Sequence, residues 1–223
     1  MQAVILAAGR GKRMNHLTND TPKPMIQVGG KNLIEWKLER LPKEVDEVIL
    51  VIGYLGEKIK NYFGSNFAGK KITYVEQGDL SGTGSALFRV KDLLSGQFIV
   101  MMGDDIYGED DVKKALSNGW SILVEKVKTP KKGAKIILNE DNTIKDIIER
   151  SDLNIGEINN AGMYVLGTEI FNYPLVPIGN DEFGLPQTIV KALKDFKIKI
   201  IEETGWIQVT NPEDVEKAGK LIK

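Results

Sequence analysis

Glycine and cationic side chains gather directly after the first apolar run of the chain. The stretch "GRGKRM" (residues 9–14) follows "AVILA" and contains two glycines together with Arg10, Lys12 and Arg13. Backbone N–H groups of a glycine-rich turn can close on a phosphate, and nearby cations neutralise its charge. The spacing is not that of a Walker A loop, and Met14 stands where the dinucleotide-binding fingerprint has its third glycine. The stretch therefore predicts a phosphate-binding loop in preference to a solvated turn.

A lysine between two prolines follows this loop. In "TPKPM" (21–25), the prolines restrict the backbone on both sides of Lys23. A stiffly held lysine shortly after a phosphate loop would keep its ammonium in position. An exposed lysine in a proline-rich loop explains the same pattern, and the residues alone leave both interpretations open.

A second glycine-rich turn occurs in "EQGDLSGTGSA" (76–86), where a predicted strand passes into a predicted helix. Free N–H groups at a helix start suit an anion or a carbonyl group, and glycine lets a flat ring approach closely. Gln77 carries both a donor and an acceptor that match the edge of a nucleotide base. An ordinary connection between strand and helix remains the alternative.

Two aspartates follow the third apolar run, in "MMGDDIYGEDD" (101–111). Asp104 and Asp105 come just past the predicted strand, at the sheet edge that also carries the first glycine loop. A carboxylate there is placed to bind Mg²⁺ alongside phosphate oxygens, and we assign this role to Asp104. The three acids at 109–111 are instead typical of the first turn of a helix.

The composition excludes several other classes of site. The chain of 223 residues has 30 basic and 31 acidic side chains, so it lacks the basic excess of a duplex nucleic-acid binder. Cysteine is absent, which excludes disulfides and thiolate metal sites. His16 is the only histidine, so neither a Ser-His-Asp triad nor a multi-histidine metal site is expected. Without a signal peptide or a stretch of membrane-spanning length, we expect a cytoplasmic protein.

Alternating strand and helix patterns must position these loops. Apolar runs rich in Val, Ile and Leu predict buried parallel strands at 3–7, 47–52, 98–102 and 121–125. Helical periodicity predicts helices at 32–41, with Leu33, Trp36 and Leu41 near one face, and at 83–94. The alternation predicts an α/β fold with a mostly parallel central sheet flanked by helices. Ligands of such sheets bind at the carboxyl ends of the strands, where all of these loops lie.

The second half of the chain departs from this alternation. Two β-rich runs flank a polar turn within 135–149 and predict a hairpin, and a third strand-like run follows at 161–166. The last segment, 211–223, predicts a helix that has Asn211 as its N-cap. No internal repeat or linker interrupts the chain, so we expect a single domain over residues 1–223.

Taken together, the motifs resemble those of the sugar-phosphate nucleotidyltransferases, also called NDP-sugar pyrophosphorylases. "LAAGRGKRM", "TPKPM", "EQ…GTGSA" and "GDD" occur in the family's order, and the first matches its Leu-Ala-Ala-Gly-x-Gly-x-Arg-Met pattern at every fixed position. The resemblance extends from Met1 to the last helix. It implies a Rossmann-like nucleotidyltransferase fold with a small β-hairpin insertion over the sugar site. In the implied reaction, a sugar 1-phosphate oxygen attacks the α-phosphate of a nucleoside triphosphate with Mg²⁺ as cofactor, and pyrophosphate leaves.

The resemblance also implies roles for the residues that match the family's motifs. Arg13 would stabilise the leaving pyrophosphate, Lys23 would neutralise charge at the α-phosphate and the incoming phosphate, and Asp104 would hold Mg²⁺. The implied nucleotide contacts are Leu6, Ala7, Ala8, Gly9, Gly11, Gln77, Gly82, Thr83 and Gly103. The implied sugar contacts are Gly133, Glu149, Asn160 and Arg150, the last of which stands where many relatives have lysine.

One position departs from the family pattern. Many relatives have an aspartate near the last strand, in a pattern like Trp-x-Asp-x-x-Thr-Pro-Glu-Asp. This chain reads "GWIQVTNPEDV" (205–215), with Gln208 at the aspartate position. An amide oxygen binds Mg²⁺ without neutralising its charge. Three interpretations follow: Gln208, Thr210 or Asn211 is a weaker second ligand, substrate phosphates complete the coordination, or the activity is reduced.

Two features of the resemblance indicate substrates. Gln77 followed by Gly-Thr-Gly resembles the uridylyl- and thymidylyltransferases, although guanylyltransferases share the glycines. Glu149 with Asn160 resembles the pocket for N-acetylglucosamine 1-phosphate, followed by glucose 1-phosphate. The expected partners are therefore UTP or dTTP and a sugar 1-phosphate, without nucleic acid or membrane, and nothing in the sequence indicates an oligomer.

Several alternatives remain beside this interpretation. Gln208 also fits a non-catalytic or weakly active sugar-nucleotide-binding protein. A cytidylyl- or guanylyltransferase acting on another phosphate shares the fold, whereas Met14 and the cations disfavour a nicotinamide-dependent oxidoreductase. Relatives often carry a C-terminal β-helix, and because the chain ends at Lys223 we expect a stand-alone transferase.

Overall fold

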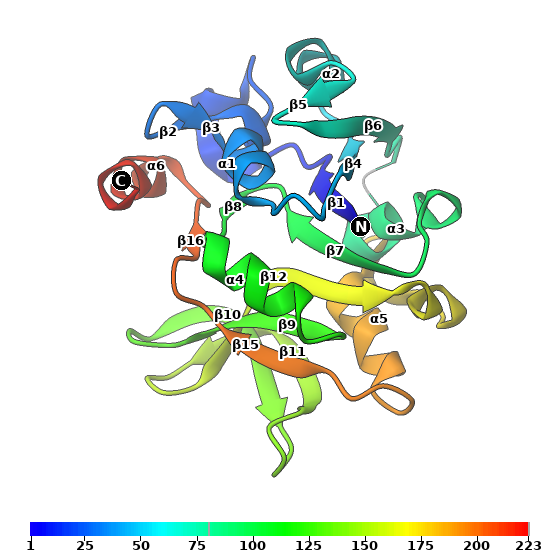
Figure 1. Ribbon diagram of the computed structural model, residues 1–223. Coiled ribbons are helices and arrows are strands. Elements are labelled where there is room, and N and C mark those ends of the chain that lie inside the picture. The colour runs from blue at the N-terminus through cyan, green and yellow to red at the C-terminus, as the bar shows by residue number, and fades with distance from the viewer. Residues whose placement is uncertain (80, 223) are drawn as a thin grey trace.

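Within residues 1–79 and 81–222, which the computed structural model describes, a mixed sheet of ten strands forms the centre of the structure (Figure 1). Its middle consists of neighbouring parallel strands in the spatial order β7 (Gln97–Met102), β1 (Gln2–Ala7), β4 (Glu47–Ile52) and β6 (Lys70–Glu76). The Val, Ile and Leu side chains of β1, β4 and β7 are mostly buried, as expected for strands covered on both faces. The predicted strands at 3–7, 47–52 and 98–102 are confirmed.

The fourth predicted strand, β9 (Ser121–Lys126), does not pair with the other three. Strand β12 (Ile158–Gly167) lies between β9 and β7 and is antiparallel to both. The parallel partner of β9 is β15 (Lys199–Glu202). The prediction of a buried parallel strand is therefore confirmed, whereas its antiparallel neighbour β12 is a finding of the structure, because an apolar run carries no information about which strand lies beside it.

A long hairpin extends the sheet beyond β12. Its strands are β10 (Lys131–Leu138) and β11 (Ile144–Leu153), which pair antiparallel, and β10 also pairs with β12. The predicted hairpin within 135–149 and the strand at 161–166 are therefore confirmed, and both are longer than predicted. In Figure 1 the hairpin lies at the end of the sheet opposite to β6 and the short edge strand β5 (Asn66–Phe67).

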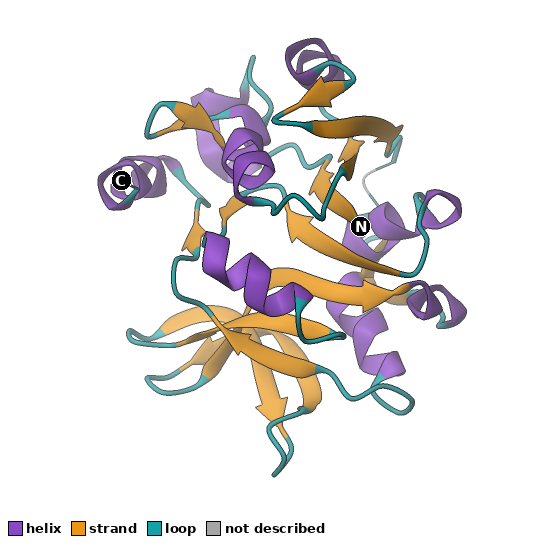
Figure 2. Ribbon diagram, viewed as in Figure 1, coloured by secondary structure: helices purple, strands orange, loops and turns teal. Residues whose placement is uncertain are grey.

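Helices cover both faces of this sheet (Figure 2). In the described part of the chain they are α1 (Leu33–Arg40), α2 (Gly56–Phe63), α3 (Gly82–Phe88), α4 (Glu109–Leu116), α5 (Leu185–Ala192) and α6 (Pro212–Leu221). Residues of α1, α2 and α4 belong to the core on one face, and residues of α3 and α5 to the core on the other. None of these helices, within the residues described, is long and apolar enough to cross a membrane.

Two helix predictions need comment. The helix predicted at 83–94 ends at Phe88, because Val90 leaves the helical backbone conformation and a separate 3-10 turn, η3 (Lys91–Leu93), follows. Helix α6 begins after Asn211, whose side chain accepts a hydrogen bond from the Asp214 N–H, so the predicted N-cap is confirmed. The last residue of that predicted helix, Lys223, and Leu80 of the second glycine stretch lie outside the described residues.

Short elements complete the fold around the carboxyl ends of the parallel strands. Two 3-10 turns, η1 (Lys12–Thr18) and η2 (Lys23–Met25), follow β1. A further 3-10 turn, η4 (Thr168–Asn172), directly follows β12. Three antiparallel pairs of short strands are β2 (Gln27–Val28) with β3 (Lys31–Asn32), β8 (Asp105–Ile106) with β16 (Ile207–Gln208), and β13 (Val176–Gly179) with β14 (Glu182–Gly184).

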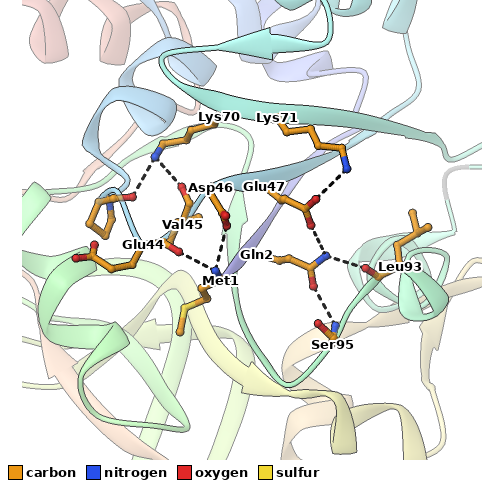
Figure 3. A network of polar contacts seen from close by, with 11 residues as sticks. Met1, Gln2, Glu44, Val45, Asp46, Glu47, Lys70, Lys71, Leu93 and Ser95 are labelled. Carbon is orange, nitrogen blue, oxygen red and sulfur yellow. Dashed lines mark hydrogen bonds and ion pairs between the residues drawn. The ribbon is translucent and has the colours of Figure 1, made fainter.

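A network of polar contacts ties together the amino ends of β1, β4 and β6 (Figure 3). The amino group of Met1 donates to the Glu44 carbonyl at 2.7 Å, and Gln2 donates to the Leu93 carbonyl at 2.8 Å. Lys70 is buried and donates to the Val45 carbonyl at 2.7 Å. These polar groups form hydrogen bonds with one another, so the contacts at the amino ends of the strands are structural. The loops with candidate chemistry lie at the opposite edge.

Candidate active site

A narrow cleft of about 540 Å³ opens at the carboxyl ends of β1, β6 and β7. We call it the narrow cleft. Its walls include every residue that the sequence predicted to contact a nucleotide, namely Leu6, Ala7, Ala8, Gly9, Gly11, Gln77, Gly82, Thr83 and Gly103. Arg13, Lys23 and Asp104 line it as well. Four motifs that are up to about 90 residues apart in the chain thus meet in one place, as the parallel topology requires.

The glycine loop wraps closely around the base of Lys23. Gly11 has a φ of +66°, in the left-handed region, and a Cβ on it would lie 2.7 Å from the Lys23 Cβ. Both the backbone conformation and the space therefore require glycine at position 11. The Met14 N–H donates to the Gly11 carbonyl at 2.9 Å, and the Met14 side chain is buried in the core beneath the loop. Met14 thus anchors the loop from below.

Lys23 and Asp104 form an ion pair in the floor of the narrow cleft. The Lys23 Nζ donates to the Asp104 Oδ2 at 2.7 Å, with 8% of the lysine side chain and 33% of the aspartate side chain exposed. Burial opposes the ionisation of Asp104, but the charges of Lys23 and Lys37 outweigh it and lower the pKa of Asp104. Of the two interpretations of Lys23, the stiffly held ammonium is the one that the structure supports.

Gln77 and the second glycine turn form the opposite wall. Gln77 is buried, and its Nε2 donates to the Gly82 carbonyl at 3.1 Å, which leaves a further donor and the amide oxygen for a ligand. Gly82 has a φ of +87°, and a Cβ there would collide with the Phe183 backbone. The Thr83 Oγ1 accepts a hydrogen bond from the Leu185 N–H at 3.1 Å. Helix α5 and strand β14 therefore hold this turn from behind.

A second, wider cavity of about 870 Å³ lies next to the narrow cleft. We call it the wide cavity. Its walls include all of the residues that the sequence predicted for the sugar and for the second metal ligand, namely Gly133, Glu149, Arg150, Asn160, Gln208, Thr210 and Asn211. The two hollows share Arg13, Thr83, Met102 and Asp104. A cation and a carboxylate thus stand on the border between two ligand-sized spaces.

The wide cavity is shaped by two irregular positions in its strands. A Cβ on Gly133 would lie 2.3 Å from the side-chain oxygen of Asn159, and the pairing of β10 with β11 shifts between Gly133 and Lys135. Asn159 is buried and bonds to the Ala134 N–H at 3.0 Å and to Glu125 at 3.1 Å. Sequence reasoning missed Asn159, whose signal was the neighbouring pair of asparagines in "INNAG".

Two predicted sugar residues have contacts of their own. The Asn160 Nδ2 donates to the Tyr164 hydroxyl at 2.8 Å, and its Oδ1 accepts from the Gly162 N–H at 3.0 Å, so Asn160 holds the bulge in β12. Glu149 reaches solvent, but the surrounding walls desolvate it and raise its pKa, while Arg150 opposes this shift. Arg150 has a φ of +56° in β11, a strained conformation for a residue with a side chain.

The side-chain oxygens that we predicted for a divalent cation lie on the short β8–β16 pair or next to it in the chain. Gln208 is exposed and stands opposite Asp105 across the pair, next to Asp104. Asn211 uses its side-chain oxygen as the N-cap of α6, which leaves Gln208 and Thr210 as the neutral donors of the three predicted. Burial and the neighbouring charge of Asp104 raise the pKa of Asp105 well above its usual range.

A buried lysine beneath this loop was missed by the sequence analysis. Lys37 on α1 has 1% of its surface exposed, and its Nζ donates at 3.0 Å to both the Leu33 and the Gly103 carbonyls. Burial lowers the pKa of Lys37 to about 8, and the charges of Asp105 and Asp104 partly oppose this shift. The signal was its position four residues after Leu33 and four before Leu41, on the apolar face of the predicted helix.

Lys37 makes folding depend on pH. Since its pKa is about 8 in the folded protein and 10.5 ordinarily, the unfolded chain binds more protons between these values, and stability rises with pH there. We expect the free energy of unfolding of wild type relative to Lys37→Met to rise by about 2 kcal/mol from pH 7 to pH 9.5. Urea unfolding of both proteins at the two pH values measures it. Parallel curves would show that Lys37 titrates normally.

The sequence is similar to known proteins over its whole length. A family model described as nucleotidyl transferase matches residues 2–222. The chain is 34% identical over 227 residues to the bifunctional protein GlmU of Methanocaldococcus jannaschii, covering 100% of this chain and 54% of that protein. It is 29% identical over 235 residues to the UTP–glucose-1-phosphate uridylyltransferase AglF of Haloferax volcanii, covering 100% and 97%. The chain spans about half the length of the GlmU relatives that it matches.

The fold is also similar to that of solved structures. The structure of UDP-glucose pyrophosphorylase complexed with UDP-glucose matches with a TM-score of 0.82 and 19% sequence identity, covering 98% of this chain and 97% of that one. At this level of identity the likeness concerns the fold, which is the Rossmann-like α/β arrangement expected from the resemblance.

Proposed function

Because a nucleotidyl transferase family model matches it from residue 2 to residue 222, the chain belongs to that family, and we propose that it transfers a nucleotidyl group from UTP or dTTP to a hexose 1-phosphate. The favoured acceptors are N-acetylglucosamine 1-phosphate and glucose 1-phosphate. The products are an NDP-sugar and pyrophosphate. The similarity to GlmU and to AglF, a UTP–glucose-1-phosphate uridylyltransferase, supports this class of reaction.

One observation carries the proposal: the narrow cleft and the wide cavity share a border formed by Arg13, Thr83, Met102 and Asp104. Nucleotidyl transfer requires a triphosphate and an acceptor phosphate to meet in line, with charge neutralised at the meeting point. A nucleotide in the narrow cleft and a sugar phosphate in the wide cavity would meet at this border. Transfer needs no acid–base pair, and the described residues of the border offer a cation and a carboxylate instead.

On the donor side, the glycine loop and the cations bind the triphosphate. The N–H groups that follow β1 would contact its oxygens, and Arg13 would stabilise the pyrophosphate as it leaves. Lys23 would neutralise charge at the α-phosphate from its fixed place beside Asp104. On the acceptor side, Glu149 and Asn160 would contact sugar hydroxyl or amide groups, and Arg150 the acceptor phosphate.

The donor set near the border fits Mg²⁺. Asp104 offers a partly exposed carboxylate that lines both hollows, and Gln208 offers an exposed amide oxygen. Among the described residues there is no group of three or more His, Cys, Asp or Glu side chains placed to hold a metal. Such a sparse set is typical of Mg²⁺, which keeps waters and phosphate oxygens as its other ligands. A bound Mg²⁺ ion would neutralise charge on the phosphate oxygens during transfer.

Pyrophosphate release tests this proposal. The protein is incubated with Mg²⁺ and each of ATP, GTP, CTP, UTP and dTTP, alone and with each hexose 1-phosphate. We expect release only when an acceptor is present, with the highest kcat/KM for UTP or dTTP. If CTP or GTP supports release and UTP and dTTP do not, the proposed nucleotide is wrong. The absence of release in every combination would contradict the proposed reaction.

Gln208 favours one alternative, a protein that binds sugar nucleotides with little or no turnover. Its neutral amide gives the metal less charge compensation than the aspartate of many relatives. This alternative predicts that UTP binds without pyrophosphate release and that Asp104→Ala leaves the affinity unchanged. Our proposal predicts that Asp104→Ala abolishes release and weakens UTP binding in the presence of Mg²⁺.

Gln77 should set the preference for the base. Replacing it with glutamate keeps an acceptor oxygen but removes the amide donor, so a base carbonyl loses its partner at a buried position. We expect Gln77→Glu to lower kcat/KM for UTP about 10- to 100-fold. Steady-state kinetics with UTP and CTP measure the effect. Gln27→Glu, an exposed change on β2, is the control, and equal losses in both variants would exclude Gln77 as a base contact.

A further inference from the structure

Asp104 lies in a loop whose backbone groups form hydrogen bonds with three other segments of the chain. The Gly103 N–H donates to the Leu6 carbonyl of β1 at 2.9 Å, and the Asp104 carbonyl accepts from the Val209 N–H at 3.3 Å. Between them, the Gly103 carbonyl accepts the ammonium of Lys37 at 3.0 Å. Of these three contacts, the one from Lys37 is made by a side chain, so it is the one that a substitution can remove.

The Lys37 contact fixes the peptide group that leads directly into Asp104. The carbonyl of Gly103 and the N–H of Asp104 belong to the same planar unit, so holding one end orients the other. A Cβ on Gly103 would lie 2.5 Å from the Leu6 carbonyl oxygen, which shows how closely the loop is pressed against β1. Asp104 then reaches Lys23 at 2.7 Å on the side of the narrow cleft.

A buried ammonium is a costly way to hold a loop. An apolar side chain of similar length would fill the same space without desolvating a charge, so packing alone does not account for Lys37. Its other contact, to the Leu33 carbonyl one helical turn earlier, orients the side chain but needs no charge either. What Lys37 adds is a strong donor beneath the loop and positive charge near Asp104 and Asp105.

We propose that Lys37 is a positioning residue for the transfer reaction, acting through the Gly103 carbonyl on the orientation of Asp104. This inference rests on the proposed function of Asp104 at the border of the two hollows. Without the Lys37 contact, the peptide between Gly103 and Asp104 rotates more freely. The Asp104 carboxylate then no longer holds one oxygen in a fixed place for a divalent cation bound to the nucleotide phosphates. Removal of a residue that orients a metal ligand in this way typically lowers metal affinity or activity about 10- to 100-fold.

A double-mutant cycle of binding tests this inference without requiring turnover. The dissociation constant of Mn²⁺ with a non-hydrolysable UTP analogue is measured by electron paramagnetic resonance for wild type, Lys37→Met, Asp104→Asn and the double variant. We expect Lys37→Met to weaken Mn²⁺ binding about 10- to 100-fold in the wild-type background. In the Asp104→Asn background the same change should have less than about a twofold effect, because residues that act through one another are not additive.

Lys70 provides a matched control. It is also buried, and its ammonium donates to the backbone carbonyls of Pro42 at 3.0 Å and Val45 at 2.7 Å, at the opposite edge of the sheet (Figure 3). Burial lowers the pKa of Lys70, as it does for Lys37. Lys70→Met should therefore destabilise the fold without changing Mn²⁺ binding.

The outcomes separate the possible roles. Additive effects of Lys37→Met and Asp104→Asn on Mn²⁺ binding, or equal effects of Lys37→Met and Lys70→Met, would overturn the positioning role and leave Lys37 as a structural lysine. Failure of the proposed function shows itself separately, as wild type that releases no pyrophosphate with any acceptor.

Discussion

Replacing Arg13 with alanine is expected to lower kcat by about 10²- to 10³-fold, by analogy with the loss of one preorganised charge partner of a transition state. Arg13 lies on the border that the narrow cleft shares with the wide cavity, where the proposed reaction would move charge to the leaving pyrophosphate. It is exposed, so its removal should leave the free energy of unfolding within about 0.5 kcal/mol of wild type. Steady-state kinetics and urea unfolding measure both quantities.

Arg10 is the control for this prediction, because it has the same charge in the same loop. Its guanidinium lies over the Tyr54 ring, 5.2 Å from the centroid, and it lines the narrow cleft but not the wide cavity. Arg10→Ala should raise the KM for the nucleoside triphosphate and change kcat much less than Arg13→Ala does. Equal losses of kcat would mean that only the overall charge of the loop matters, and the role of Arg13 would have to be withdrawn.

Replacing Lys23 with methionine should lower kcat by a similar factor, about 10²- to 10³-fold, and should also destabilise the fold. Methionine keeps the length of the side chain but leaves Asp104 without its partner at 2.7 Å. Breaking a buried pair by removing one member is costly, and because 33% of the Asp104 side chain is exposed we expect a loss of about 1–3 kcal/mol, below the range for full burial.

The double variant Lys23→Met with Asp104→Asn separates the two effects. It removes both charges of this pair, so its free energy of unfolding should return toward that of wild type. Its activity should remain low, because neither the α-phosphate nor a cation has its proposed partner. If activity returned together with stability, Lys23 would act on the fold and not on the reaction.

The parts of the site that depend on local sequence could be predicted. Gly11 and Gly82 both have positive φ values, and the glycine-rich turns after the first and third parallel strands of the chain's first half were predicted from this local chemistry. The carboxyl ends of β1, β6 and β7 meet at one edge because parallel strands require it, so the convergence of the four motifs followed from the fold class. The family resemblance then supplied roles that the residues alone did not.

Other parts depend on contacts between distant segments, which no local pattern records. The partner of Lys23 lies 81 residues away in the chain, so the sequence left its role open. Position 82 requires glycine partly because a Cβ there would collide with the Phe183 backbone, and Phe183 belongs to the short strand β14. The neighbours of β9 could not be predicted for the same reason, since the strand that separates it from β7 comes later in the chain.

Lys37 shows how an exception to a pattern can indicate a site. The periodicity of α1 predicts an apolar face, and from the sequence alone a lysine on that face is interpreted as an exposed residue at the margin of the face. The structure buries it completely and gives it two carbonyl partners, one of which leads into Asp104. A charged residue at a core position of a predicted helix therefore indicates a buried polar partner, which in this protein is the loop that contains Asp104.

The central claim is that the two hollows hold a donor nucleotide and an acceptor sugar phosphate for direct transfer. Its most direct test is identification of the product by mass spectrometry and ³¹P NMR after incubation with Mg²⁺, UTP and N-acetylglucosamine 1-phosphate or glucose 1-phosphate. We predict that wild type forms the UDP-sugar and pyrophosphate in equal amounts and that the initial rate of both is about 10²- to 10³-fold lower in Arg13→Ala. Consumption of UTP to other products, or a UDP-sugar yield that Arg13→Ala leaves unchanged, would contradict the claim.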